Sequence, residues 1–374
     1  MNPLPKRIVV RIPNWLGDAV MATPALQRLR EAAPESHITL LTAAKLADLW
    51  TNYPYANHII SVPSGESVLG VAPRLRGKFD VGLILPSSPR SALEMFLARV
   101  PIRVGFARPW RTWCLTDPIA SRPNAIHPKK RSTAEIKRLV QLQTRGRTVY
   151  PASAHQIYDY LYLLSGLGLK VQVAAPKLYV TDPEIAAAKQ KFLSAFPGIP
   201  CWVGMNAGAE YGPAKRWPAE QFVEAAVRIY NASKCGLVLF GGARDVQTMD
   251  SIGAGIAAHC KAPLVNLAGK TSLREFCAAV RLCRVLLTND TGPMHLAAAV
   301  GTPVVVPFGS TSPELTGPGL PERGSPHKLL TGDVPCAPCF RRECPVDFRC
   351  MRSIAVEQVV SAVLDRLQHR TPEP

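Results

Sequence analysis

The segment TNDTGPMH, residues 288–295, has the residue types and spacing of a phosphate-binding turn. It follows an apolar stretch and leads into a helix-like stretch that Gly301 ends. A strand, a tight turn and a helix leave free backbone N–H groups at the helix start, where a phosphate is bound well. Pro293 suits the first helical turn because it has no N–H to lose, and Gly292 lets the backbone approach a ligand oxygen. We therefore expect Thr291 and Gly292 to offer backbone amides to a diphosphate.

Two polar side chains of the same turn allow two interpretations each. Asp290 could hydrogen-bond a sugar hydroxyl, or it could cap the helix, which needs no functional role. His295 lies one turn into the helix and could contact the ligand, although a lone histidine is more often structural than catalytic. Both are included among the candidate donor-binding residues.

A cationic loop, residues 208–218 (GAEYGPAKRWP), follows an expected strand. Its Lys215 could neutralise the charge of a leaving diphosphate, with Arg216 as the second candidate. The alternative is a surface loop with two solvated cations, but the glycines and the first proline favour a tight turn. A further strand-end loop, 241–245, brings Asp245 as a possible partner for ribose hydroxyls.

Near the other end of the chain, the strand-like run 7–12 leads into PNWLGD, where Gly17 precedes Asp18. Transfer of a sugar to an alcohol needs a base for the hydroxyl proton, and a carboxylate at the end of a strand could supply it. Asp18 could instead be a helix N-cap, but a helix that begins there would carry Pro24 in its interior. Thr23 capping a helix that begins at Pro24 would be ordinary. We expect Asp18 to be the base.

The strands and helices that must position these residues alternate in the same way in both halves of the chain. A chain of 374 residues suits two domains, which we place at 1–178 for an acceptor and 179–374 for a phosphorylated donor, with the crossing near 176–183. Alternating strands and helices predict an α/β protein with two Rossmann-like parallel sheets and ligands at the carboxyl ends of the strands, in a cleft between the halves. Strands are expected at 7–12, 37–42, 58–62, 81–85, 201–205, 236–240, 263–267, 284–288 and 303–307.

Positive charge is concentrated in one part of the chain. The formal net charge is +17, and residues 101–150 alone hold 11 Lys or Arg against Asp117 and Glu135. Interleaved prolines and two tryptophans predict a loop-rich basic surface there. A solvated surface would need no partner, but such a concentration favours an anionic one: a nucleic acid, an acidic membrane surface or a phosphorylated substrate. The candidate acceptor-binding residues are Arg103, Arg108 and Arg111.

Hydrophobic residues make up 47% of the chain and charged residues 19%, so both halves can fold. The apolar run near the N-terminus is interrupted too early for a signal peptide, and no apolar run reaches membrane-spanning length. We therefore expect a cytoplasmic protein.

Four of the ten cysteines fall in one short segment: Cys336, Cys339, Cys344 and Cys350. In a cytosolic protein such a cluster is more often a zinc or iron–sulfur site than a pair of disulfides. The spacing is too compressed for a two-knuckle zinc pattern, so a structural metal is only a hypothesis. The other cysteines mostly lie in apolar context and are interpreted as small core residues.

Taken together, WLGD, YGPAKRWP, TNDTGPMH and the closing CAPCFRRECP resemble glycosyltransferase family 9, most closely its ADP-heptose:lipopolysaccharide heptosyltransferase II branch. The resemblance covers nearly the whole chain. It implies a GT-B fold and an inverting transfer, without metal or cofactor, of L-glycero-D-manno-heptose from ADP-heptose to the inner core of lipopolysaccharide. It also implies that Asp18 is the base, that Lys215 contacts the diphosphate, and that the donor turn comprises Asp290, Thr291, Gly292 and His295.

The resemblance gives the basic segment a role as well. The acceptor is rich in phosphate and carboxylate groups, so residues 101–150 would dock it at the cytosolic face of the inner membrane. Two alternatives stay open. One is a GT-B enzyme with another nucleotide-sugar donor, such as a UDP-sugar transferase or an epimerase. The other, more distant, is a basic nucleic-acid-binding protein, although the chain has no recognition-helix pattern and no aromatic residues interleaved on a basic sheet, so no nucleic-acid partner is expected.

Overall fold

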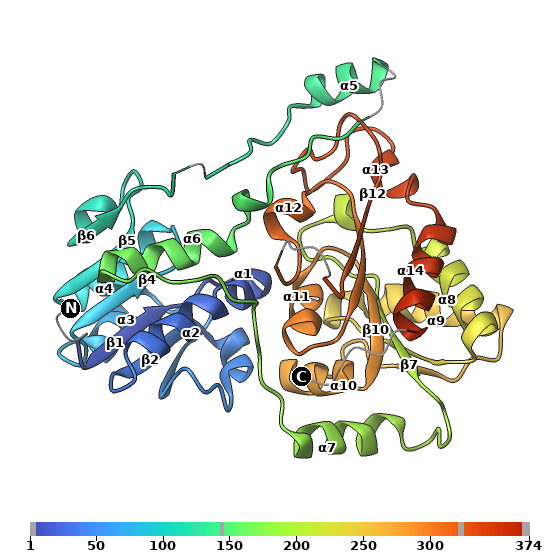
Figure 1. Cartoon of the computed structure of the whole chain (residues 1–374), viewed down its shortest axis with the longest axis horizontal. Coiled ribbons are helices and arrows are strands. Elements are labelled where there is room, and N and C mark those ends of the chain that lie inside the picture. Colours follow the sequence, from blue (N-terminus) through green and yellow to red (C-terminus); the bar gives the residue numbers. More distant parts are fainter. Residues whose placement is uncertain (1–4, 124, 143–145, 321–324, 369–374) are drawn as a thin grey trace. The chain divides into compact units, whose positions relative to one another are not determined.

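The chain divides into two compact units (Figure 1), and the computed structural model describes residues 5–123, 125–142, 146–320 and 325–368. The first unit comprises Met1–Ala125 and Ser153–Tyr179, and the second comprises Ile126–Ala152 and Val180–Pro374. Each unit is built on a six-stranded sheet whose strand pairs are all parallel. The predicted α/β class with two Rossmann-like halves is confirmed.

The first sheet has the strand order β3-β2-β1-β4-β5-β6. Its strands are β1 (Arg7–Arg11), β2 (His37–Ala43), β3 (His58–Val62), β4 (Val81–Ile84), β5 (Ile102–Phe106) and β6 (Asp117–Ile119). Its helices are α1 (Leu16–Met21), α2 (Thr23–Ala32), η1 (Ala44–Trp50), α3 (Val68–Leu75), α4 (Pro89–Leu97), η2 (Thr112–Cys114), α6 (Ile157–Tyr162) and η4 (Leu163–Leu167). Because the chain runs outward from β1 and returns to β4, the carboxyl ends of β1 and β4 form a switch point, the usual place for a ligand in such sheets.

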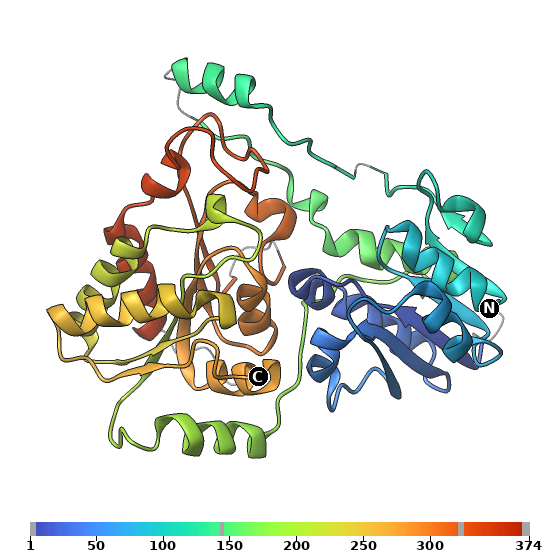
Figure 2. The ribbon, with the colours of Figure 1, turned by 180° about the vertical axis from the view of Figure 1, so that it is seen from behind.

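The second sheet has the order β12-β11-β10-β7-β8-β9, with its switch point between β7 and β10. Its strands are β7 (Trp202–Asn206), β8 (Gly236–Leu239), β9 (Leu264–Asn266), β10 (Cys283–Thr288), β11 (Val304–Phe308) and β12 (Lys328–Thr331). Its helices are α5 (Thr133–Gln141), α7 (Asp182–Leu193), η5 (Pro213–Lys215), α8 (Ala219–Ser233), η6 (Ala243–Asp245), α9 (Val246–His259), α10 (Leu273–Arg281), α11 (Gly292–Ala299), α12 (Pro313–Thr316), α13 (Arg349–Arg352) and α14 (Val356–Gln368). Helices α8, α9 and α14 cover one face of this sheet, and α10 and α11 cover the other (Figures 1 and 2).

All nine predicted strands are present, with ends that differ from the expected ones by at most one residue. In strands such as β1, β4 and β7, apolar side chains are buried on both faces, which is why these strands were recognisable as continuous apolar runs. Among the described residues, no helix is both long and apolar enough to cross a membrane.

The prediction that residues 101–150 form a loop-rich surface is wrong in part, because β5, β6 and α5 lie within that segment. The structure also divides the segment between the units, since the chain enters the second unit at Ile126 and returns to the first at Ser153. The excursion is held by backbone hydrogen bonds from Arg131 to Cys339 and from Thr148 to Ala337, and by Ile136, which is buried in the core of the second unit. The second crossing, at Tyr179–Val180, lies inside the expected range 176–183.

Candidate functional site

The turn between β10 and α11 has the geometry that the sequence predicts. Strand β10 ends at Thr288, Thr291 occupies the N-cap position, and Pro293 lies in the first helical turn. In the described structure no side chain caps α11. Thr291 and Gly292 are only partly buried, so the amino-terminal end of the helix is open to a ligand. Such an end favours an anion because its N–H groups and the helix dipole point the same way.

Lys215 and Asp290 form an ion pair beside this turn. Lys215 Nζ lies 2.6 Å from Asp290 Oδ2, and the two side chains are 12% and 3% exposed. The Thr311 hydroxyl also donates to Asp290, and the Lys215 ammonium lies 4.9 Å from the centre of the Tyr211 ring. An ammonium has three protons, so Lys215 can hold the carboxylate and still donate to a phosphate. Asp290 is not the helix cap, because Thr291 occupies that position, and its contact with Lys215 fixes the direction of the cation.

Two buried asparagines, which the sequence analysis missed, tie the donor turn to the loop after β7. Asn289 is fully buried; its Nδ2 donates to Ala207 O at 2.8 Å, and its Oδ1 accepts from the backbone N–H of Trp217 at 3.0 Å. Asn206 accepts from Gly208 N at 2.9 Å. Each asparagine ends or closely follows an apolar strand, and that position is the signal that could have revealed them.

Asp245 and His295 occupy different environments near this edge of the second sheet. Asp245, which follows β8, accepts from Gly242 N at 3.0 Å and packs on Gly208, where a Cβ atom would lie 2.5 Å from its carboxyl carbon. The loops after β7, β8 and β10 therefore lie together at the carboxyl edge of the sheet. His295 is 5% exposed, so its ring lies within the fold.

In the first unit, Asp18 lies in α1, which directly follows β1. Gln156 Nε2 donates to Asp18 Oδ1 at 3.0 Å and to the Tyr160 hydroxyl at 2.9 Å. Burial raises the pKa of Tyr160 well above its usual value, and the nearby Asp18 carboxylate raises it further. The phenol therefore stays neutral, and Asp18 is the acidic group of this cluster.

Neither helix-cap interpretation of this region holds. Trp15, and not Asp18, precedes α1, while Ala22 separates α1 from α2. Pro24 therefore lies in the first turn of α2 and interrupts no helix. Thr23 does not cap α2, because its hydroxyl donates back to Val20 O at 2.7 Å.

A buried ion-pair network, also missed from the sequence, supports the loop that leads from β1 to α1, the helix that carries Asp18. Arg11 Nε lies 2.8 Å from Glu94 Oε2, and the two side chains are 3% and 0% exposed. Glu94 also pairs with Arg90 at 3.1 Å, and Arg11 Nη1 donates to Asn14 Oδ1 at 3.2 Å. A buried pair of this kind is retained only where its geometry is good, so it fixes the path of the chain after β1. An arginine inside an otherwise apolar strand was the available signal.

The three candidate acceptor-binding arginines differ in what their side chains contact. Arg103 donates to Cys114 O and Val100 O, both at 2.6 Å. Arg111 is fully buried and donates to Pro86 O at 2.6 Å; burial, together with the neighbouring Arg108, lowers its pKa to about 10. Arg108 is half-buried and lies over the Phe106 ring. Of the three, Arg108 has the geometry closest to that of a surface residue that contacts a ligand.

Ion pairs with acidic residues neutralise part of the positive charge of residues 101–150. Within the first unit, Arg122 pairs with Asp159 at 3.0 Å. Within the second unit, Arg147 pairs with Glu314, which is 18% exposed. The segment is therefore not one continuous cationic surface.

The four clustered cysteines, Cys336, Cys339, Cys344 and Cys350, line one small cavity together with Arg349. All ten cysteines of the chain are free thiols. Burial, together with the other three thiols, raises the pKa of Cys350 to about 12. Within the described ranges, no group of three or more His, Cys, Asp or Glu residues is arranged to hold a metal ion. The remaining cysteines are buried or half-buried, as expected.

Comparison with known proteins gives matches along most of the chain. Residues 68–348 match the family model of glycosyltransferase family 9 (heptosyltransferase). The chain is 30% identical to lipopolysaccharide heptosyltransferase 2 of Salmonella typhimurium over 334 residues, which cover 87% of this chain and 89% of that protein. The corresponding Escherichia coli protein gives the same identity and coverage.

Solved structures agree. The E. coli ADP-heptose LPS heptosyltransferase II superposes with a TM-score of 0.73 at 24% identity, covering 96% of this chain and 98% of that one. A family 9 glycosyltransferase from Veillonella parvula superposes with a TM-score of 0.77 at 25% identity, covering 97% of each chain. The protein is a member of glycosyltransferase family 9, the heptosyltransferase family, and has its two-unit α/β fold.

Proposed function

We propose that the protein transfers L-glycero-D-manno-heptose from ADP-heptose to the inner core of lipopolysaccharide, as an inverting enzyme that uses no metal. The names of its relatives support a heptose donor and a lipopolysaccharide or lipooligosaccharide acceptor. The alternative is another nucleotide-sugar donor on the same fold.

One observation of the site carries this proposal: the Lys215–Asp290 pair lies beside the open end of α11, at the switch point of the second sheet. As ADP departs, negative charge builds on the diphosphate. The amides of Thr291 and Gly292 and the ammonium of Lys215 stabilise that charge, and loss of one such donor typically costs about 100-fold or more in rate. Asp290 acts as a positioning residue through Lys215. Asp245 is proposed to contact the ribose, and His295 supports the helix behind the turn.

The acceptor half of the reaction is assigned to the first unit. The Asp18 carboxylate takes the proton of the acceptor hydroxyl. At the same time, the oxygen of that hydroxyl forms the new bond to the anomeric carbon, and the bond from that carbon to the diphosphate breaks. A single displacement of this kind inverts the anomeric centre. Gln156 orients Asp18 through its 3.0 Å hydrogen bond. Arg108 is proposed to contact the anionic acceptor, while Arg103 and Arg111 stabilise the backbone near Arg108.

We further propose that this protein works at the cytosolic face of the inner membrane, and that the segment after β5 touches the lipid surface. Trp110 is 85% exposed and Trp113 is 62% exposed. Trp110 has a φ of 67°, a conformation that a bulky residue adopts only at a cost. Indole rings favour the membrane interface, and the cationic neighbours Arg108 and Arg103 suit anionic lipids.

Two measurements test the function. In thermal-shift titrations, ADP should stabilise the protein more than UDP does, because at equal concentration the ligand that binds the folded state more tightly stabilises it more. A radiolabelled transfer assay on truncated lipopolysaccharide cores should then show transfer from ADP-heptose and none from UDP-sugars. Equal or greater stabilisation by UDP, together with transfer from a UDP-sugar, would replace the proposal with its alternative.

A further inference from the structure

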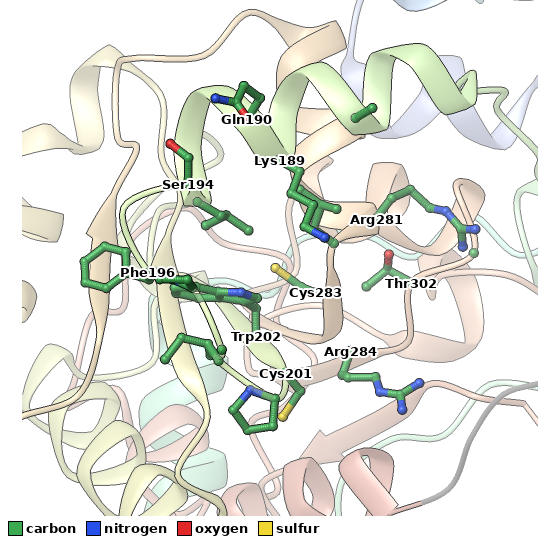
Figure 3. A pocket seen from close by; sticks show the side chains of 18 of the residues that line it. Lys189, Gln190, Ser194, Phe196, Cys201, Trp202, Arg281, Cys283, Arg284 and Thr302 are labelled. Atoms are coloured by element: carbon green, nitrogen blue, oxygen red, sulfur yellow. The ribbon is translucent and has the colours of Figure 1, made fainter.

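A large hollow opens at the edge of the second sheet opposite the donor turn. Its volume is about 970 Å³, and it is bounded by the end of α7, the loop that follows, the first residues of β7 and β10, and the turn before β11 (Figure 3). The donor turn lies at the other end of β10, a strand of six residues, which corresponds to about 20 Å. A ligand in this hollow would therefore occupy a site separate from the donor site of the same unit.

The hollow is strongly cationic. Lys189, Arg281 and Arg284 line it, and no aspartate or glutamate is among its lining residues. In the described part of the chain, none of these three side chains forms an ion pair, although the protein forms such pairs at many other cations. Positive charges gathered around one concavity raise the local concentration of anions.

The backbone of β10 turns Arg284 toward this hollow. Cys283 pairs with Trp202 and Val285 with Val203, so Arg284 is an extra residue between two consecutive pairs, and the register of the two strands shifts there as it does at a β-bulge. It is the exposed residue of a strand whose other five residues are buried. Bulges redirect side chains and are frequent beside functional sites. A cation that needed only solvent would not require this irregularity in a central strand.

Arg281 lies at the end of α10, against the backbone of Gly301. Gly301 has a φ of +89°, and a Cβ atom there would lie 3.0 Å from Arg281 Nη1. The interaction of a cation with the carboxyl end of a helix explains an arginine at this position. It does not explain why Lys189, on α7, and Arg284, on β10, line the same hollow.

The opposite part of the hollow is apolar. Phe196 and Trp202 pack edge to face, with their ring centres 5.9 Å apart. In the view of Figure 3, Arg281, Arg284 and Thr302 lie to the right, Phe196 lies to the left, and Lys189 reaches between them. The hollow thus combines a cationic part with an aromatic part, and its volume is that of a site for a ligand of nucleotide size or larger.

We propose that this hollow is a second binding site, which takes a ligand with a phosphate or diphosphate group on an apolar or aromatic body. The phosphate would contact Arg281, Arg284 and Lys189, because guanidinium groups bind phosphate oxygens in pairs. The body would lie toward Trp202 and Phe196. Such a ligand is either a soluble nucleotide or the phosphorylated headgroup of a glycolipid. The site is independent of the proposed transfer reaction.

Isothermal titration calorimetry with inorganic pyrophosphate tests the soluble source. The titration is done without ADP, because a soluble nucleotide could fill the second site as well, and the Lys215→Gln variant identifies the binding that belongs to the donor site. At the second site the wild-type protein should bind one equivalent. Arg284→Gln should weaken this binding about tenfold, the loss of about one charge-assisted contact, and Arg281→Gln with Arg284→Gln should abolish it. The matched control is Lys261→Gln, an exposed cation of the same unit outside the hollow, and it should bind like the wild type.

Vesicles that contain a diphosphorylated glycolipid test the second source by co-sedimentation. Loss of vesicle binding in Arg284→Gln but not in Lys261→Gln supports a lipid headgroup. Loss of pyrophosphate binding in the same variant supports a soluble ligand. The proposal is overturned if the double arginine variant keeps wild-type binding of both probes, or if the wild-type protein binds neither. Lys215→Gln separates the two sites, because it should weaken ADP binding and leave the second site unchanged.

Discussion

Variants of the Lys215–Asp290 pair test the donor site, because the pair should affect the stability of the protein and its affinity for ADP differently. The Asp290 side chain is 3% exposed and lies 2.6 Å from the Lys215 ammonium. The change Lys215→Gln removes the countercharge of a buried carboxylate, and breaking a buried pair in this way costs about 3 to 5 kcal/mol. Because the Thr311 hydroxyl still donates to Asp290 and the new amide can do so as well, we expect the lower end of that range, about 3 kcal/mol.

The double variant Lys215→Gln with Asp290→Asn replaces the ion pair by two neutral amides. Its stability should return to within about 1 kcal/mol of the wild type, because no buried charge is left without a partner. The double-mutant cycle should therefore show a coupling of about 2 kcal/mol or more. Hydrogen exchange of the backbone amides in β10 and α11 measures the unfolding free energy of each variant in the second unit alone.

Ligand affinity should behave differently. A hydrogen bond between a lysine and a phosphate contributes about 1.5 to 3 kcal/mol, so Lys215→Gln should weaken ADP binding about 10- to 100-fold. The double variant should be equally weak, although its stability is restored. Calorimetric titration with ADP provides the measurement. The reasoning is refuted if the two residues show no coupling, or if the double variant binds ADP like the wild type.

Two further predictions concern pH and membrane contact. Burial, together with Arg366, lowers the pKa of His327 to about 4, so the contribution of this residue to stability is complete above pH 6.5 and is lost between pH 6.5 and 4. In His327→Gln, which can still accept from Val304 N, the urea midpoint should fall less over this window; an equal fall would contradict the assignment. Trp110→Ser with Trp113→Ser should reduce co-sedimentation with anionic vesicles several-fold, whereas Leu142→Ser, at an exposed apolar residue of the second unit, should not; equal binding by all three proteins would remove the proposed contact.

Most of the fold could be predicted because its central strands are buried on both faces and therefore form unbroken apolar runs. The missed strands lack that property. β5 contains Arg103, whose charge interrupts the run, and β6 is a three-residue edge strand. β12 is also a short edge strand, with no fully buried residue. The position of 126–152 in the second unit depends on contacts with residues about 200 positions away, which no local pattern reveals.

Some features of the candidate site could likewise be predicted from the sequence, and others could not. The turn at Thr291 and Gly292 could be predicted because Gly and Pro have local conformational preferences. The partnership of Lys215 with Asp290 could not, since it joins loops from two different strands. For Arg111 the local sequence pattern was misleading. A basic, proline-rich segment predicts an exposed side chain, yet this one is fully buried and donates a hydrogen bond to the backbone. Chemistry that depends on one turn is visible in a sequence, while chemistry that depends on pairing is not.

The proton-accepting role of Asp18 is the central claim of the mechanism, and one steady-state comparison tests it directly. Asp18→Asn keeps the shape of the side chain and an oxygen that can accept from Gln156, while Asp18→Ala removes both. Both variants should bind ADP-heptose with a Kd within about twofold of the wild type. Both should lose transfer to truncated lipopolysaccharide cores by about 100-fold or more, the usual contribution of a general base. Near-normal turnover by Asp18→Asn, with donor binding intact, would contradict the account.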